Sequence, residues 1–206
     1  LESAYRGLIG QALSTSDIDK ILLGLHERVD FSTQKIFQDR EMDFGINLLT
    51  KESAYASLVR FFKWEQSQIE HLATMGQHLQ INTLETKLEA DIHVEGHLIK
   101  MKGVIDRIDY CCDQLRIIDY KTGGVEQKDL NLDSSFIKIL DGNQPKALQL
   151  LTYGYLWKKN MAKSDNLSAG IISLKNISND FIPLTEDKKP FNWLGIEEQF
   201  SDLMRQ

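Results

Sequence analysis

The sequence predicts a mixed α/β domain, because a helical N-terminal part precedes three consecutive strands, and these are followed by a helix, a strand and a helix. Of its 206 residues, 42% are hydrophobic and 26% are charged, the balance of an ordinary globular protein. That much apolar material can form a core without disulfides or a structural metal. We therefore expect a helical region over residues 1–80 and an α/β core over residues 81–206.

The helices are predicted from apolar residues that recur at spacings of three and four. Thr15 or Ser16 is the expected cap of a first helix that runs to Leu25. A longer amphipathic helix is expected from Thr50 to about Leu72. Two further helices are expected later in the chain, one over about 145–157 and a closing one over 193–203.

The strands are predicted from segments rich in β-branched and aromatic residues. Three of them follow one another over 84–94, 98–110 and 115–120, and residues 168–174 have the character of a further buried strand. Residues 123–145 are rich in turn-forming types and are expected to form one long loop.

Composition excludes several classes of protein. The net charge of −6 argues against a protein that coats nucleic acid without specificity, but not against an enzyme with a local basic strip. No run of eighteen apolar residues and no secretory leader is present, so no membrane association is expected. The adjacent Cys111 and Cys112 suit neither a relaxed disulfide nor a CxxC metal site, which favours a reducing cytoplasm. The sequence also lacks a P-loop, a GxSxG elbow and a GxGxxG fingerprint.

The second and third strands are expected to form a hairpin that turns at Cys112–Asp113. Paired positions in an antiparallel ladder have a constant sum, here 225. Asp106 is therefore expected opposite Asp119, and Val104 opposite Lys121, with all four side chains on one face. Arg107 and Asp109, on the other face, are expected to form a surface ion pair or a cap.

Two carboxylates that face each other repel, and a divalent cation between them would remove that repulsion. Oxygen ligands suit Mg²⁺ or Mn²⁺. Lys121, close to Asp119 on the same face, could orient a water molecule or neutralise charge on a phosphoryl group. Taken alone, Asp-x-Lys is more common as a surface ion pair. The combination of Asp106, Asp119 and Lys121 favours phosphodiester hydrolysis.

Three segments together resemble the PD-(D/E)XK nuclease superfamily, and specifically its RecB-like branch. They are Gly-Val-Ile-Asp-Arg-Ile-Asp from Gly103, Ile-Asp-Tyr-Lys-Thr-Gly from Ile118, and Gln-Leu-Leu-Thr-Tyr from Gln149 to Tyr153. The last is similar to the Gln-x-x-x-Tyr motif of that branch. Three motifs in this order and spacing are more specific than any one of them.

The resemblance implies a restriction-endonuclease-like core and DNA cleavage that depends on Mg²⁺ or Mn²⁺. It implies that Asp106 and Asp119 bind the metal, with the backbone carbonyl of Tyr120 as a further ligand, and that Lys121 is the catalytic lysine. Gln149 and Tyr153, one helical turn apart, are implied to reach the site or the DNA backbone.

The chain departs from the RecB-like pattern at one position. That branch usually has a histidine ligand on an N-terminal helix, in a Gly-x-x-x-His context, and the nearest match here is Gly7-Leu-Ile-Gly-Gln11. A glutamine can offer its carbonyl oxygen, but it binds metal less well than imidazole does. Weaker metal binding, a changed metal preference or lost activity follows as a hypothesis. Glu85 is a further acidic residue near the predicted site, for which an exposed strand carboxylate is the simpler interpretation.

The expected function is therefore that of a DNA nuclease, with exonuclease action in recombinational repair as the finer expectation. The resemblance suggests a domain of a larger helicase–nuclease, with DNA as the substrate and a helicase domain or subunit as partner. The alternative is a catalytically attenuated nuclease fold that binds DNA or braces a helicase partner. A hydrolase of another phosphodiester is also open.

Overall fold

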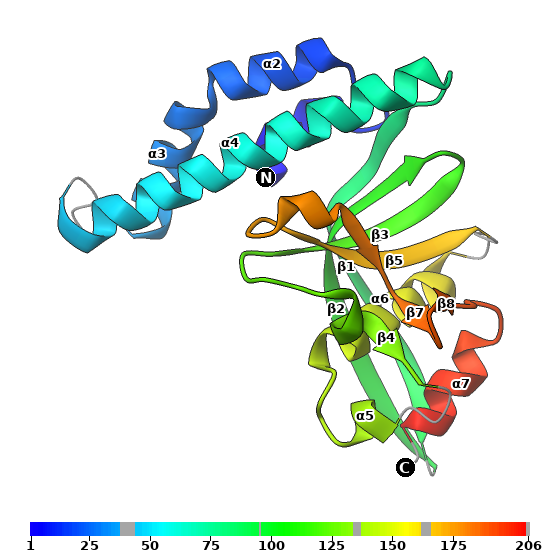
Figure 1. Cartoon of the computed structure of the whole chain (residues 1–206). Coiled ribbons are helices and arrows are strands. Elements are labelled where there is room, and N and C mark those ends of the chain that lie inside the picture. The colour runs from blue at the N-terminus through cyan, green and yellow to red at the C-terminus, as the bar shows by residue number, and fades with distance from the viewer. Residues whose placement is uncertain (38–43, 95, 134–136, 162–165, 205–206) are drawn as a thin grey trace. The chain divides into compact units, whose positions relative to one another are not determined.

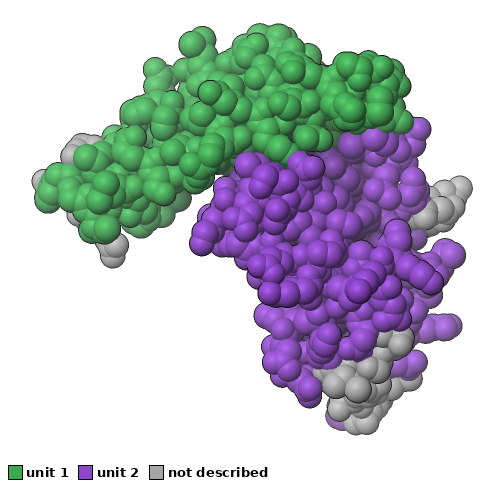
Figure 2. Space-filling model, in the orientation of Figure 1, with its two compact units in different colours: residues 1–80 green, residues 81–206 purple. Residues whose placement is uncertain are grey.

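The computed structural model describes residues 1–37, 44–94, 96–133, 137–161 and 166–204 (Figure 1). The chain divides into two compact units, residues 1–80 and residues 81–206 (Figure 2). The first is helical and the second is built on a five-stranded mixed sheet with helices, so the predicted α/β class is confirmed. In the described part of the chain, no helix is both long enough and apolar enough to span a membrane.

The first unit is a set of helices around one long helix. Both α2 and α3 pack against α4, and the core between them includes Tyr5, Phe61 and Phe62, which are fully buried. The Tyr5 hydroxyl donates to the carboxylate of Glu65, a buried acid on α4. The elements are α1 (Glu2–Tyr5), η1 (Arg6–Leu8), α2 (Thr15–Leu23), α3 (Leu25–Ile36) and α4 (Gly45–Thr74).

The expected cap of α2 is wrong by one or two residues. Thr15 is already the first helical residue, and Ser14, with an extended backbone, is the N-cap. The Ser14 hydroxyl accepts from the Asp17 amide at 3.3 Å, and the Asp17 carboxylate accepts from the Ser14 amide at 3.1 Å. This reciprocal pair satisfies two amides that the first turn of a helix leaves without partners.

The second unit contains a sheet with the strand order β1-β2-β3-β5-β6. The pair β2–β3 is antiparallel, β3–β5 is parallel and β5–β6 is antiparallel. The sheet is therefore mixed, as expected. Its strands are β1 (Leu79–Val94), β2 (His97–Cys111), β3 (Gln114–Lys121), β5 (Leu167–Ser173) and β6 (Phe181–Pro183).

The hairpin between β2 and β3 has the predicted turn and register. Cys112 and Asp113 have φ values of 54° and 59°, the left-handed conformation that a two-residue type I′ turn requires at both positions. The paired residues run from Cys111 opposite Gln114 to Arg107 opposite Ile118, and each pair sums to 225. The hairpin thus brings Asp106 and Asp119 to the same end of the two strands.

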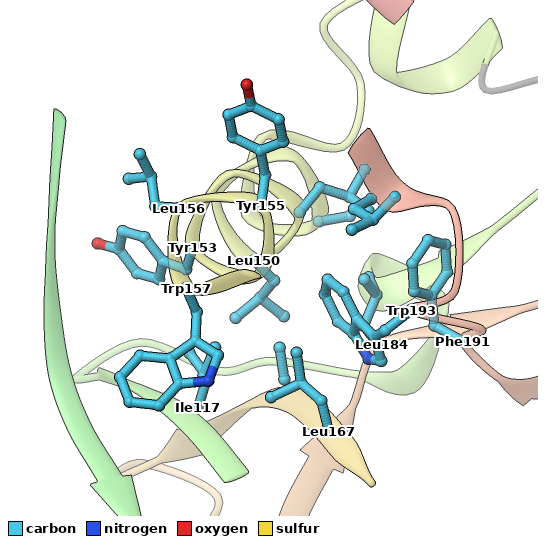
Figure 3. Close-up of a cluster of buried hydrophobic side chains, with 14 of the residues drawn as sticks. Ile117, Leu150, Tyr153, Tyr155, Leu156, Trp157, Leu167, Leu184, Phe191 and Trp193 are labelled. Carbon is cyan, nitrogen blue, oxygen red and sulfur yellow. The ribbon is translucent and has the colours of Figure 1, made fainter. Parts of the chain in front are cut away.

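The helix α6 (Pro145–Asn160) connects the parallel strands β3 and β5 and packs on β2, β3 and β5. Pro145 suits the first helical position, where its missing amide hydrogen costs no hydrogen bond. Figure 3 shows Leu150 of α6 above Ile117 of β3, within the main core of the unit. The closing helix α7 (Ile196–Leu203) packs against α6.

The segment predicted as one long loop is more ordered than expected. It contains η2 (Gln127–Leu130), β4 (Asn131–Leu132) and α5 (Ile137–Leu140), while residues 134–136 lie outside the described part. The apolar Leu130 and Leu132 are fully buried, which fixes this segment to the core. The strand β4 pairs with β7 (Thr185–Glu186), which pairs with β8 (Lys189–Pro190). The 3-10 helix η3 (Ile177–Asn179) lies between β5 and β6.

Candidate active site

The two aspartates lie on neighbouring strands, Asp106 on β2 and Asp119 on β3. The Tyr120 backbone amide donates a hydrogen bond of 2.8 Å to Asp106 Oδ2. Because Tyr120 directly follows Asp119, this bond holds the Asp106 carboxylate beside the backbone that carries Asp119. The structure therefore brings together the two acids that the sequence predicts to face each other.

The Asp119 side chain is buried, and burial disfavours its negative charge. That side chain is only 4% exposed, and the Lys121 ammonium lies 2.8 Å from its Oδ2 atom. Among the described residues, however, none donates a well-aligned hydrogen bond to this oxygen. Burial raises the pKa of Asp119, and the negative charge of Asp106 raises it further. The nearby Lys121 lowers this pKa but does not outweigh the burial, so the pKa lies above its ordinary value. A further cation at this carboxylate would offset the cost of its burial.

Lys121 connects the strands to α6. Its ammonium donates to Gln149 Oε1 at 2.8 Å, and Gln149 Nε2 in turn donates to the Tyr153 hydroxyl at 2.7 Å. Gln149 and Tyr153 lie one turn apart on α6, which accounts for their common direction. A series of contacts thus joins Asp119 and Lys121 on β3 to Gln149 and Tyr153 on α6.

Tyr153 remains a protonated phenol near neutral pH. Burial raises its pKa, the hydrogen bond from Gln149 acts against this, and the charges of Asp119, Asp106 and Glu85 raise it further. Since the hydroxyl oxygen accepts from Gln149, its own hydrogen is available for donation. Tyr153 can therefore offer a hydrogen bond to an anionic group.

Glu85 is an exposed residue on β1 with a left-handed backbone, φ 47°. The Cβ atom makes this conformation unfavourable, and in a strand it breaks the regular alternation of faces. The buried residues of β1 are odd-numbered before Glu85, Leu79 and Ile81, and even-numbered after it, Leu88 and Ile92. The strand thus changes its facing at a residue whose charge acts on Tyr153.

Arg107 and Asp109 do not form the surface pair that the sequence suggests. Both are buried, at 1% and 0% exposure, and their side chains meet at 2.7 Å. Arg116 adds two hydrogen bonds to Asp109, of 2.7 and 2.9 Å. The prediction is wrong because strand alternation indicates on which face a residue lies, but not how deeply that face is buried. We refer to Arg107, Asp109 and Arg116 as the back-face cluster.

Gln11 lies in the first unit, in a bend that follows η1 and the turn at Ile9–Gly10, and its side chain is exposed. It therefore does not lie on a helix, unlike the histidine of the RecB-like pattern. The backbone amide of Gln11 donates a hydrogen bond of 3.3 Å to the backbone carbonyl of Leu8. A role for Gln11 as a metal ligand stays a prediction from the sequence.

The residues suit a divalent cation in part. In the described part of the chain, no three His, Cys, Asp or Glu side chains are grouped so as to hold a metal. Two carboxylates are nevertheless brought together, and one has a buried oxygen without an aligned donor. Mg²⁺ commonly uses only one or two protein carboxylates and keeps several waters. The donor set therefore fits a hard, partly hydrated cation.

Two residues that shape the site were not predicted from the sequence. The first is Gly103, because a Cβ there would come within 3.1 Å of the Tyr153 ring and 2.9 Å of Leu156. The second is Ser173, a buried residue paired with Lys121, whose hydroxyl donates to the Gly123 carbonyl at 2.8 Å. A polar residue directly after the apolar run Ala169–Ile172 was the available signal for Ser173.

The sequence profile of the PD-(D/E)XK nuclease superfamily matches residues 10–203. No curated protein matches the sequence of this chain. Among solved structures, the chain is similar to the protein described in "Crystal structure of SSO0001". The two share 16% sequence identity over 90% of this chain and 75% of that chain, with a TM-score of 0.34. The family match extends over nearly the whole sequence.

Proposed function

This chain belongs to the PD-(D/E)XK nuclease superfamily, and on that premise we propose that it hydrolyses DNA phosphodiester bonds at the site formed by Asp106, Asp119 and Lys121. The observation that carries this proposal is the buried Asp119 Oδ2 atom, which faces the Lys121 ammonium and has no aligned donor among the described residues. The Lys121 ammonium compensates this buried charge only in part, because the pKa of Asp119 stays raised, so a further cation would stabilise the carboxylate.

We assign Asp106 and Asp119 as carboxylate ligands of Mg²⁺ or Mn²⁺, with the Tyr120 carbonyl and Gln11 as further proposed ligands. When bound, such an ion supplies positive charge that stabilises the negative charge developing on the phosphoryl oxygens. The hydrogen bond from the Tyr120 amide keeps Asp106 oriented before any ligand arrives. Orientation in advance lowers the cost of assembling the site.

Lys121 is assigned as the catalytic lysine. An ammonium has three N–H donors; Gln149 accepts from one of them, and the contact with Asp119 is an ion pair without an aligned hydrogen bond. A remaining donor can bind a water molecule or a phosphoryl oxygen. Gln149 restricts the position of the ammonium, and Tyr153 restricts Gln149 in the same way. We assign Gln149 and Tyr153 to positioning Lys121 and to contact with the DNA backbone.

The finer assignments rest on the sequence motifs. The Gln-x-x-x-Tyr segment on α6 supports the RecB-like branch, because its two polar side chains extend the hydrogen-bond chain of Lys121. We propose exonuclease action in recombinational repair and a place in a larger helicase–nuclease. The proposed hydrolysis at Asp106, Asp119 and Lys121 does not depend on these finer proposals. It would stand even if exonuclease action, the role in repair or the place in a helicase–nuclease proved wrong.

The direct test is cleavage of labelled DNA with Mg²⁺ or Mn²⁺ by the wild-type chain and by Asp119→Ala and Lys121→Ala. We expect cleavage by the wild type, and loss of at least about a hundredfold in each variant, as for removal of one charge-stabilising group. Asp91→Ala, at an exposed aspartate on β1 without a positive φ, is the matched control and should cleave normally. Equal rates for the wild type and Asp119→Ala would contradict the proposal.

The form of the substrate resolves the finer proposals. Linear DNA cleaved from its ends, with covalently closed circles left intact, supports exonuclease action, whereas cut circles contradict it. RNA and small phosphodiesters in parallel reactions test whether the substrate is DNA.

A second candidate is a nuclease fold that binds DNA without cutting it. It is favoured by the glutamine at position 11 and by the lack of a three-residue metal group among the described side chains. Under this proposal Asp119→Ala leaves DNA affinity almost unchanged, and the wild type shows no metal-dependent cleavage.

A further inference from the structure

We propose that Arg107 is a positioning residue for the candidate site: held between Asp109 and the Tyr120 hydroxyl, it fixes the strand segment whose amide binds Asp106. This inference rests on the proposed function, because it concerns how Asp106 is held for metal binding. It assigns a role to the back-face cluster, which the proposed chemistry does not use.

The back-face cluster is held together by charged hydrogen bonds. Asp109 has no exposed surface. Its carboxylate forms an ion pair with Arg107 Nη2 at 2.7 Å and accepts two hydrogen bonds from Arg116. Although burial alone raises the pKa of Asp109, the two guanidinium groups outweigh it, so the pKa lies below its ordinary value and the acid stays ionised. The fork-shaped contact with Arg116 fixes orientation as well as distance.

Packing holds the cluster from a second direction. The Arg116 guanidinium lies over the Phe181 ring, 5.2 Å from its centre. That ring occupies the space above Gly170, where a Cβ would come within 2.6 Å of it. Gly170 on β5 pairs with Ile118 on β3, so the cluster is fixed to the middle of the sheet.

Tyr120 connects this cluster to the candidate site. Arg107 Nη1 donates to the Tyr120 hydroxyl at 3.1 Å, and the Tyr120 amide donates to Asp106 Oδ2 at 2.8 Å. One residue is thus held through its side chain on the back face, while its amide binds the acid of the candidate site. Asp119 and Lys121, its two neighbours, move with it if this hold is released.

Removing the hydroxyl tests this hold with little change of shape. Tyr120→Phe deprives a buried guanidinium of an acceptor, so Arg107 and the Tyr120 segment should rearrange. Mutation of groups that orient metal ligands typically weakens metal affinity by about tenfold or more. We therefore expect about tenfold weaker Mn²⁺ binding by the whole chain, measured by titration with detection of free Mn²⁺ by electron paramagnetic resonance. Tyr110→Phe, the same change on the exposed Tyr110 of the same hairpin, is the control and should bind Mn²⁺ like the wild type.

A double-mutant cycle shows whether Arg107 transmits the effect. Arg107→Lys replaces the two-branched guanidinium by one ammonium, which cannot reproduce the planar fork. In that background, Tyr120→Phe should change the Mn²⁺ dissociation constant less than twofold. If both changes lower only the melting temperature and leave Mn²⁺ affinity intact, the cluster is merely structural and the inference is overturned.

The two proposals fail in different ways. If wild-type and Asp119→Asn chains bind Mn²⁺ equally poorly, the proposed metal site is wrong and the inference falls with it. If the wild type binds Mn²⁺ and Tyr120→Phe binds it equally well, the positioning role alone is refuted.

Discussion

The Asp119 carboxylate is almost completely buried, and its charge lies beside that of Asp106. Because its pKa is raised in the folded chain, the folded state binds a proton more tightly than the unfolded state does. By linkage, the metal-free protein loses stability as pH rises from the unfolded pKa through the raised folded pKa.

Asp119→Asn is therefore expected to stabilise the metal-free protein at pH 7, because the amide is never charged. Mn²⁺ at one hundred times its dissociation constant should stabilise the wild type by about 2.7 kcal/mol, and the variant not at all. Thermal unfolding with and without Mn²⁺ at pH 7 measures both effects. A variant that is less stable than the wild type without metal would contradict this account of Asp119.

Glu85 is a second residue at which local geometry is unfavourable, since its φ of 47° lies in the left-handed region. Glu85→Gly should raise the free energy of unfolding by about 0.5–1 kcal/mol, because glycine adopts this conformation without a steric penalty. Lys87 lies on the same strand but has no positive φ, so Lys87→Gly should lower the free energy of unfolding by a similar amount. Urea denaturation of the three proteins provides the comparison, and equal effects of the two substitutions would contradict the role of backbone strain.

At the scale of elements, α6 packs very closely against its neighbours at Gly154. A Cβ at Gly154 would lie 1.9 Å from the Trp193 ring, which Figure 3 shows beside the helix. Gly154→Ala should therefore cost about 1–3 kcal/mol of stability through overpacking. It should also reduce cleavage, because α6 carries Gln149 and Tyr153. Gly123→Ala is the control, since a Cβ there meets no atom within 4 Å. Chemical denaturation should separate the two variants by at least about 1 kcal/mol.

The elements differ in how far the sequence predicts them. The β2–β3 register is predictable because a two-residue turn and a period of two fix every pair. The change of facing in β1 is not, because no glycine or proline marks the left-handed Glu85. Asp109 binds Arg116, which lies over the ring of Phe181, a residue far along the chain, and no local pattern contains that contact. The buried Leu130 and Leu132 were similarly hidden among turn-forming neighbours.

At the scale of the whole molecule, the predicted site residues come from both compact units. Asp106, Asp119, Lys121, Gln149 and Tyr153 belong to residues 81–206, whereas Gln11 belongs to residues 1–80. The sequence profile of the superfamily begins at residue 10, so the match includes position 11. The carboxylate and lysine chemistry can thus be argued within one unit, and only the Gln11 proposal concerns the other.

Gln11→His tests that proposal on the whole chain. An imidazole nitrogen binds Mn²⁺ better than an amide oxygen does, so the substitution should tighten Mn²⁺ binding and increase metal-dependent cleavage if position 11 supplies a ligand. We expect an increase of about tenfold in affinity, the order by which supporting groups at metal sites act. Gln34→His on α3, also exposed and in the same unit, controls for an added surface histidine and should have no effect. If both histidines act alike, position 11 is no ligand, and the Gly7-to-Gln11 segment does not correspond to the histidine motif of the RecB-like branch.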